Sequence, residues 1–303
     1  MKSATLQRKK IKTARLSIIS NTFLIIIKLA VGILSGSVSI ISEAIHSLMD
    51  LMAAIIAFFS VKISALPPDK KHPYGHGKFE NISGVIEAIL IFIAAGWIIF
   101  EAIEKLLKPT TPNFLGIGAI VMAISAGVNF WVSRRLYKVA KETDSVALEA
   151  DALHLKTDVY TSLGVAIGLI LIWVSGLIWN KAIVLIDPII AILVALLILK
   201  ESYVLLKKAY APLLDTPLPD DEILIIENTI KQQITPEMGY HMLRTRKAGH
   251  IRYVDLHLEV PGNLSVIDSH NLCDIIEKEI ISKLNHIEVY IHIEPTPPKD
   301  GDS

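Results

Sequence analysis

The chain has 303 residues, of which 52% are hydrophobic, with a mean hydropathy of +0.50 and a formal net charge of zero. This composition is more apolar than that of ordinary soluble domains, and it indicates that much of the chain lies in a lipid bilayer. Residues 1–210 are net basic and residues 211–303 are net acidic, which argues against nucleic acid as a partner. The single cysteine, Cys273, excludes an intrachain disulfide and a thiol-rich metal site.

Six apolar stretches are each long enough to cross a bilayer, which takes about 20 helical residues. They are expected near 14–35, 39–64, 82–106, 114–137, 148–177 and 182–208. Basic side chains gather in the loops on the N-terminal side, for example at Lys70, Lys71, Arg134 and Arg135. Because cytoplasmic loops carry the excess of Lys and Arg, both termini are expected in the cytoplasm. The short loops without a His-rich insert favour the cell (cytoplasmic) membrane.

Residues 212–295 have the pattern of a small soluble domain, which follows a membrane domain of residues 1–211 and precedes a flexible tail at 296–303. Acidic residues after Pro219 mark the start of a helix that runs to Ile234. A second helix is expected at 265–284, with strands at 240–246, 251–260 and 287–294. The order αββαβ predicts a two-layer, metallochaperone-like α+β domain, so the fold class is an α-helical membrane protein of six transmembrane helices with a cytosolic α+β domain.

Two pairs of ionisable residues lie within the expected spans, where such residues are costly and therefore candidates for function. His46 and Asp50 belong to the second span, and His154 and Asp158 to the fifth. The spacing of four residues puts each pair on one helix face. One such pair is also compatible with a structural hydrogen bond, but its recurrence in a second span favours a site. Asp151, less than a turn before His154, is a candidate for lining the access path.

The ligands of these two pairs suit a divalent metal ion. Two imidazoles and two carboxylates complete a tetrahedral Zn²⁺ site, and a divalent ion neutralises the charge of the two carboxylates. The same groups take up protons when the metal leaves, so exchange of metal for protons is a natural coupling.

Three motifs give the chain a resemblance to the cation diffusion facilitator family of metal/proton antiporters. They are GSVSIISEAIHSLMD at 36–50, HPYGHGKFE at 72–80 and ALEADALHLKTD at 147–158. The resemblance implies a homodimer that carries divalent ions in exchange for protons by alternating access across the lipid bilayer, with six spans in each protomer. It places the transport site on His46, Asp50, His154 and Asp158, a set similar to that of zinc-preferring members.

A second cluster lies in a cytoplasmic loop, at Asp69, His72 and His76. Residues of these types at this spacing can hold a metal with open or water-filled positions, although a solvated loop with turns at its glycines fits the residues equally well. The resemblance favours metal binding, because some members of the family bind a loop metal there.

A third cluster is expected on the soluble domain, which the resemblance describes as a metal-sensing and dimerisation domain. Alternation along the strands puts His257, His292 and Glu294 on the face of the sheet opposite its apolar side. The resemblance maps a binuclear cytosolic site onto His241, His257, His292 and Glu294, with His270 as a further candidate ligand. It also implies a charged interlock between Lys78 and Asp215, at the junction of the membrane and cytosolic parts.

Two rival functions fit the same residues less well. A membrane metallohydrolase needs an open coordination position and usually a general base, and the sequence has no HExxH motif. A membrane-anchored metal sensor needs its helices only as an anchor, so this function does not explain the His/Asp pairs within the spans. The ligand types do not separate Zn²⁺ from Cd²⁺, Co²⁺, Ni²⁺, Fe²⁺ or Mn²⁺, and no organic cofactor is expected.

Overall fold

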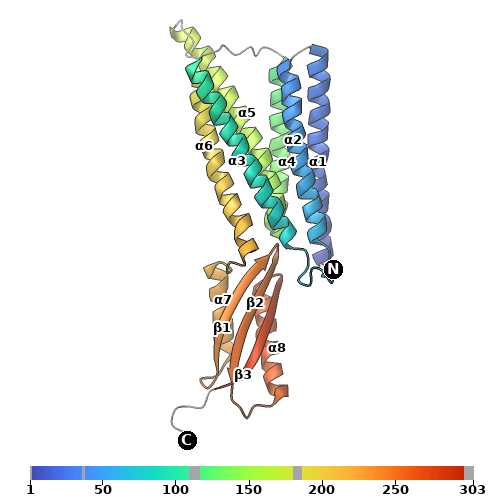
Figure 1. Ribbon diagram of the computed structural model, residues 1–303, viewed down its shortest axis with the longest axis vertical. Coiled ribbons are helices and arrows are strands. Elements are labelled where there is room, and N and C mark those ends of the chain that lie inside the picture. Colours follow the sequence, from blue (N-terminus) through green and yellow to red (C-terminus); the bar gives the residue numbers. More distant parts are fainter. Residues whose placement is uncertain (1, 36–37, 109–116, 180–185, 297–303) are drawn as a thin grey trace. The chain divides into compact units, whose positions relative to one another are not determined.

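The computed structural model describes residues 2–35, 38–108, 117–179 and 186–296. The chain divides into two compact units, Met1–Tyr210 and Ala211–Ser303, each of which has its own core. The first unit is a helical bundle and the second combines helices with a small sheet (Figure 1).

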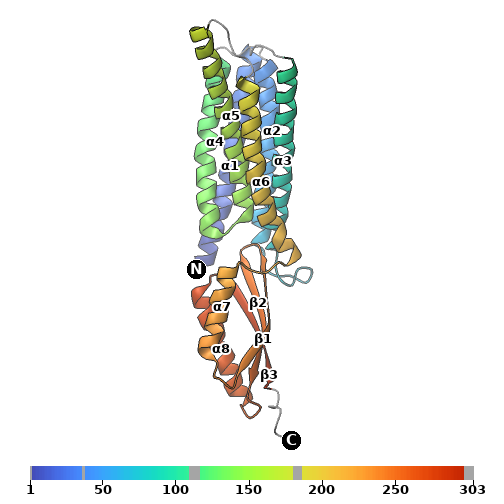
Figure 2. The ribbon, with the colours of Figure 1, turned by 90° about the vertical axis from the view of Figure 1, so that its left-hand side faces the viewer.

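The described part of the first unit forms long helices that lie side by side (Figures 1 and 2). They are α1 (Lys2–Ser35), α2 (Val38–Ser64), α3 (Lys78–Leu107), α4 (Ile117–Thr143), α5 (Val146–Trp179) and α6 (Ile186–Tyr210). Helix α1 begins well before the expected start at residue 14, because residues 2–31 contain no Gly or Pro that would end a helix.

Within the described residues, three segments are long and apolar enough to cross a membrane: Thr5–Leu34, Lys78–Leu107 and Pro188–Leu214. Apolar side chains on their outer surfaces, such as Phe23, Trp97 and Leu193, are more than half exposed. Exposed apolar side chains on long helices suit contact with lipid. A membrane domain is therefore supported, while the count of six spans stays a prediction.

Small residues let the helices of the bundle approach closely. Helix α3 packs against α6 and α5, and Gly84 lies on this contact surface. A Cβ atom added to Gly84 would lie 2.8 Å from Cγ1 of Val146 and 3.0 Å from Cβ of Ala209. The glycine is thus required for the observed spacing of the helices, as is common in membrane bundles.

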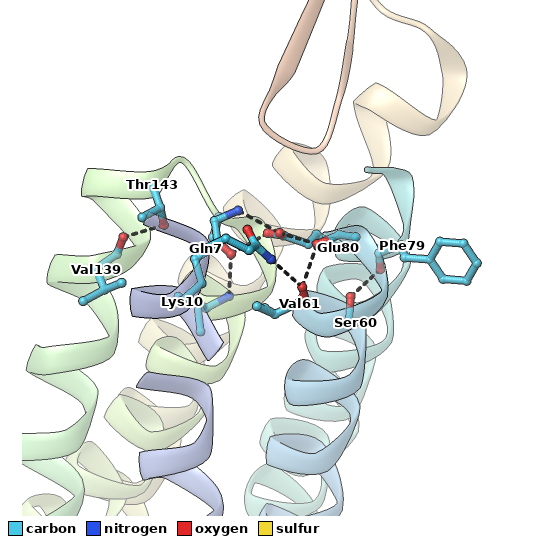
Figure 3. Close-up of polar contacts among 11 residues, drawn as sticks. Gln7, Lys10, Ser60, Val61, Phe79, Glu80, Val139 and Thr143 are labelled. Atoms are coloured by element: carbon cyan, nitrogen blue, oxygen red, sulfur yellow. Dashed lines mark hydrogen bonds and ion pairs between the residues drawn. The ribbon is translucent and has the colours of Figure 1, made fainter. Parts of the chain in front are cut away.

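A buried ion pair joins several helices at the end of the bundle nearest the N-terminus. The carboxylate of Glu80 in α3 accepts hydrogen bonds from Nζ of Lys10 in α1 at 2.9 Å and from Oγ of Ser64 in α2 at 2.8 Å. Oγ of Ser145, just before α5, donates to the other carboxylate oxygen. Figure 3 shows Lys10 and Glu80 pointing toward each other between these helices. Charge-assisted hydrogen bonds of this kind satisfy a carboxylate that has no access to water.

The second unit has the αββαβ order that the sequence predicts. After a short 3₁₀ helix, η1 (Ala211–Leu214), the elements are α7 (Asp220–Gln233), β1 (Gly239–Ala248), β2 (Ile251–Val260), α8 (Val266–Lys283) and β3 (Ile287–Pro295). The sheet order is β1-β2-β3, with β1 and β2 antiparallel and β2 and β3 parallel.

The core of the second unit lies between one face of the sheet and the two helices. Val254, Leu256 and Leu258 alternate along β2 and are buried against Ile226 of α7 and Ile276 of α8. The helices cover this face (Figure 2). The intervening residues of β2 point to the opposite face, because successive strand residues alternate in direction. The cytosolic cluster predicted from the sequence belongs to that second face.

Candidate metal centres

Three of the four predicted transport-site residues come together inside the helical bundle. Asp50 of α2 and His154 and Asp158 of α5 each offer a ligand atom, and these atoms all lie within 4.8 Å of one another. Nε2 of His154 lies 3.1 Å from Oδ1 of Asp50. Asp50 and His154 are only 6% and 8% exposed, whereas Asp158 is half-buried.

The backbone of His46 lies in α2, one turn before Asp50, but its side chain is outside the part of the chain that the structure describes. Its place as a fourth ligand therefore stays a prediction. Asn129 of α4 was not predicted, and its Nδ2 donates to Oδ2 of Asp158 at 3.4 Å. A polar residue in the fourth apolar stretch is the only sequence signal that points to it.

Two further carboxylates lie buried in the bundle. Asp151, less than a turn before His154, is 0% exposed and accepts a hydrogen bond from Oγ of Ser17 at 3.0 Å. It therefore does not line an open path in this conformation, contrary to one expectation from its position. Glu87 of α3 is also 0% exposed and accepts from Oγ of Ser83 at 3.2 Å.

The loop between α2 and α3 brings Asp69, His72 and His76 together, again with ligand atoms within 4.8 Å of one another. Nδ1 of His72 lies 3.3 Å and Nε2 of His76 3.5 Å from the Asp69 carboxylate. Gly75 has a φ of +80°, which turns the chain between the two histidines. The loop is thus folded so that its three candidate ligands converge.

The Asp69 carboxylate is also the anchor of this loop. Its Oδ1 accepts the backbone N–H of His72 at 2.6 Å and that of Lys71 at 2.8 Å. The hydrogen bond from His72 in particular lowers the pKa of Asp69 below its ordinary value. The ionised form, which is the one that binds a metal, is therefore favoured.

The cytosolic cluster is assembled by strand pairing. His241 of β1 pairs with His257 of β2, which pairs in turn with His292 of β3, so the three imidazoles form a row across the sheet. Ligand atoms of His241, His257 and Glu294 lie within 4.8 Å of one another. The Glu294 carboxylate lies 2.8 Å from Nδ1 of His257, 3.3 Å from Nε2 of His241 and 3.6 Å from Nε2 of His292.

The structure does not bring His270 to this cluster within one chain. It lies on α8, in the helix layer on the other side of the sheet, and 74% of its side chain is exposed. Nε2 of His270 is 3.8 Å from Oδ1 of Asp274, one turn further along the helix. Its role as a ligand stays a prediction.

Lys78 and Asp215 belong to different units, Lys78 at the start of α3 and Asp215 directly after η1. Oδ1 of Asp215 lies 3.6 Å from Nη1 of Arg246, within the second unit. The predicted interlock between Lys78 and Asp215 therefore stays a prediction.

All three clusters offer imidazole nitrogen and carboxylate oxygen, the donor set of Zn²⁺ and similar divalent ions. A bundle of long apolar helices with such groups buried inside it is the architecture of a membrane protein that handles cations. The family model for the cation efflux transmembrane domain matches residues 14–214, and the model for the cytoplasmic domain of cation efflux proteins matches residues 218–296. The chain belongs to the cation diffusion facilitator family.

The chain is similar to curated proteins along most of its length. It is 35% identical to an uncharacterised transporter from Synechocystis sp. over 89% of this chain and 85% of that protein. It is 31% identical to the cation-efflux pump FieF from Salmonella newport, over 92% of this chain and 91% of the pump. Among solved structures, the metal-bound C-terminal domain of the CzcD transporter from Thermotoga maritima is 29% identical and covers 27% of this chain and 99% of that domain, with a TM-score of 0.23.

Family membership has direct consequences for function. The protein is a cation-efflux transporter of the cell membrane and not an enzyme, which sets the metallohydrolase alternative aside. The cytoplasmic-domain match also indicates dimerisation and metal-ion binding.

Proposed function

We propose that the protein exports Zn²⁺ from the cytosol in exchange for protons, through a tetrahedral site of His46, Asp50, His154 and Asp158 across six membrane spans. The observation that carries the proposal is the convergence of Asp50, His154 and Asp158 inside the bundle, with ligand atoms within 4.8 Å of one another. Buried carboxylates without a compensating positive charge are costly. These groups therefore bind either the metal ion or protons, and release of one is coupled to binding of the other.

The direction of coupling follows from the ligands. A metal binds carboxylates and neutral imidazoles, so protons leave these groups when the metal binds and return when it departs. Protons from the far side of the membrane displace the metal. The protonated, metal-free site then returns to face the cytosol. His154 and His46 are the proposed proton carriers, while Asp50 and Asp158 hold the charge.

The loop and cytosolic clusters are proposed as additional metal sites. Asp69, His72 and His76 would hold one ion beside the bundle. His241, His257, His292 and Glu294 would hold regulatory zinc on a homodimer whose termini are cytoplasmic. Cytosolic metal would stabilise the dimer and favour transport.

Reconstitution in liposomes tests the transport proposal. Vesicles hold a zinc-sensitive dye and have an acidic lumen, and zinc is added outside. We expect the wild type to accumulate Zn²⁺ while the lumen becomes more alkaline, and Asp158→Asn to do neither. Lys156→Ala serves as control, because this neighbouring side chain is 42% exposed and pairs with Glu201 outside the cluster.

Two results would overturn the proposal. One is zinc flux that persists in Asp158→Asn, and the other is flux without any change in lumenal pH. Competition by Cd²⁺, Co²⁺, Ni²⁺, Fe²⁺ and Mn²⁺ in the same assay ranks the alternative substrates, since ligand type alone does not separate them.

A further inference from the structure

Glu259 lies beside the cytosolic cluster and contacts His241 from the side away from Glu294. Its Oε1 is 3.1 Å from Nδ1 of His241, while Nε2 of the same ring is 3.3 Å from Oε2 of Glu294. The two nitrogens of His241 therefore face two different carboxylates. In a neutral imidazole only one nitrogen carries a proton, and the other offers the lone pair that a metal needs.

Gly239 gives the Glu259 carboxylate its room. The two residues are paired across β1 and β2, and a Cβ atom built on Gly239 would lie 2.6 Å from Oε2 of Glu259. Any other residue at position 239 would have to displace this carboxylate. Gly239 has no comparable contact with His241, so its effect reaches the ring through Glu259.

The backbone of β1 is irregular directly after His241. The register with β2 shifts between His241 and Arg244, so Met242 and Leu243 both oppose Leu256. Met242 has a φ of +51°, an unusual value for a residue with a side chain. Bulges of this kind re-aim the neighbouring side chain, and here they leave the ring of His241 between Glu259 and Glu294.

We propose that Glu259 is a positioning residue of the cytosolic metal site: it accepts the Nδ1–H of His241 and so directs the Nε2 lone pair toward an ion held with His257 and Glu294. Gly239 is required for the same arrangement, because the absence of a side chain leaves space for the Glu259 carboxylate. The inference rests on the proposed function, since it requires that the cytosolic cluster binds a divalent ion. Carboxylates that bind the second nitrogen of a ligating histidine fix its tautomer and orientation in many metal sites.

The test measures zinc affinity of the full chain in detergent, by competition with a chromogenic chelator. Asp69→Ala and Asp158→Ala are introduced throughout to remove binding by the other two clusters. In this background we expect Glu259→Ala and Gly239→Ala each to weaken zinc binding about ten- to a hundred-fold. Glu259→Gln should retain most of the affinity, because its amide oxygen still accepts the Nδ1–H.

Two further measurements separate positioning from a general structural effect. In a His241→Ala background, Glu259→Ala should cause no additional loss, because its target is gone. The visible absorption of bound Co²⁺ should change in Glu259→Ala toward the spectrum of His241→Ala, since it reports the ligand set. Glu288→Ala is the matched control: this exposed glutamate lies on the same face of β3, outside the cluster, and contacts Tyr290.

Several outcomes would overturn the inference. Wild-type affinity in both Glu259→Ala and Gly239→Ala would show that the contact has no role. An equal loss in Glu259→Gln and Glu259→Ala would make Glu259 a ligand rather than a positioning residue. Absence of zinc binding in the parent background, while the wild-type protein still transports zinc in liposomes, would refute this inference and leave the transport proposal in place.

Discussion

Lys10 and Glu80 form an ion pair that is almost wholly shielded from solvent, with the two side chains 2% and 0% exposed. Two hydroxyl groups, those of Ser64 and Ser145, complete the hydrogen bonds of the Glu80 carboxylate. A satisfied pair of this kind adds little net stability compared with apolar side chains, but removal of one partner leaves an uncompensated buried charge. The cost of a single substitution should therefore exceed the cost of replacing both residues.

We predict that Lys10→Ala lowers the free energy of unfolding by about 3–5 kcal/mol. The double variant Lys10→Met with Glu80→Gln should lose less, because no charge remains buried. Thermal unfolding in detergent, followed by circular dichroism, measures both. Lys12→Ala is the control, since Lys12 is an exposed lysine of the same helix. Unfolding of Lys10→Ala at the wild-type temperature would contradict the prediction.

At the scale of elements, the two glycines of α3 allow a matched comparison. Gly84 lies where α3 meets Val146 and Ala209, whereas a Cβ atom on Gly96 would meet nothing within 4 Å. The same substitution thus forces a steric clash at one position and fills open space at the other.

We predict that Gly84→Ala destabilises the bundle by about 1–3 kcal/mol, because the helices must move apart to admit the methyl group. Gly96→Ala should leave stability unchanged or raise it by about 0.5–1 kcal/mol, because alanine is the better helix former. Unfolding temperatures of the two variants in the same detergent give the comparison. Equal effects would show that the close approach at Gly84 is not a constraint.

Periodicity was sufficient to predict the elements of the second unit. Alternation along β2 predicted that His257 faces away from Leu256 and Leu258, and the register with β1 and β3 puts His241 and His292 beside it. The recurrence of a His/Asp pair in two spans, together with the family resemblance, predicted that Asp50 and His154 belong to one site, and Nε2 of His154 lies 3.1 Å from Oδ1 of Asp50. These predictions depended only on local repeats and on the motifs shared with the family.

Contacts between elements could not be predicted from the same patterns. The partnership of Lys10 with Glu80 joins residues far apart in the chain, and no local repeat links them. Strand alternation puts Glu259 on the same face as His257, but the bulge that turns His241 toward it leaves no signature in the sequence. His270 was assigned by resemblance alone, and one chain does not bring it to the cluster.

At the scale of the whole molecule, the chain combines two units with separate cores, residues 1–210 and 211–303. The two family models divide at nearly the same place, at residues 214 and 218. In the proposed function the membrane unit carries the same ion that the cytosolic unit binds, so both units would respond to one chemical signal. Regulation by cytosolic metal would then need no second ligand.

The row of imidazoles across β1, β2 and β3 would make the proposed metal affinity a property of the folded sheet, because His241, His257 and His292 are neighbours only when the strands are paired in register. An ion that binds this row selects the folded state, by about 2.7 kcal/mol at a free concentration one hundred times its Kd. We therefore predict that zinc slows hydrogen–deuterium exchange of the backbone amides in these strands, and that His257→Ala abolishes the effect. Exchange that is insensitive to zinc in the wild type would contradict this. The lifetime of the transporter in a cell would then depend on its own substrate, with protein made during metal scarcity being the first to unfold and be degraded.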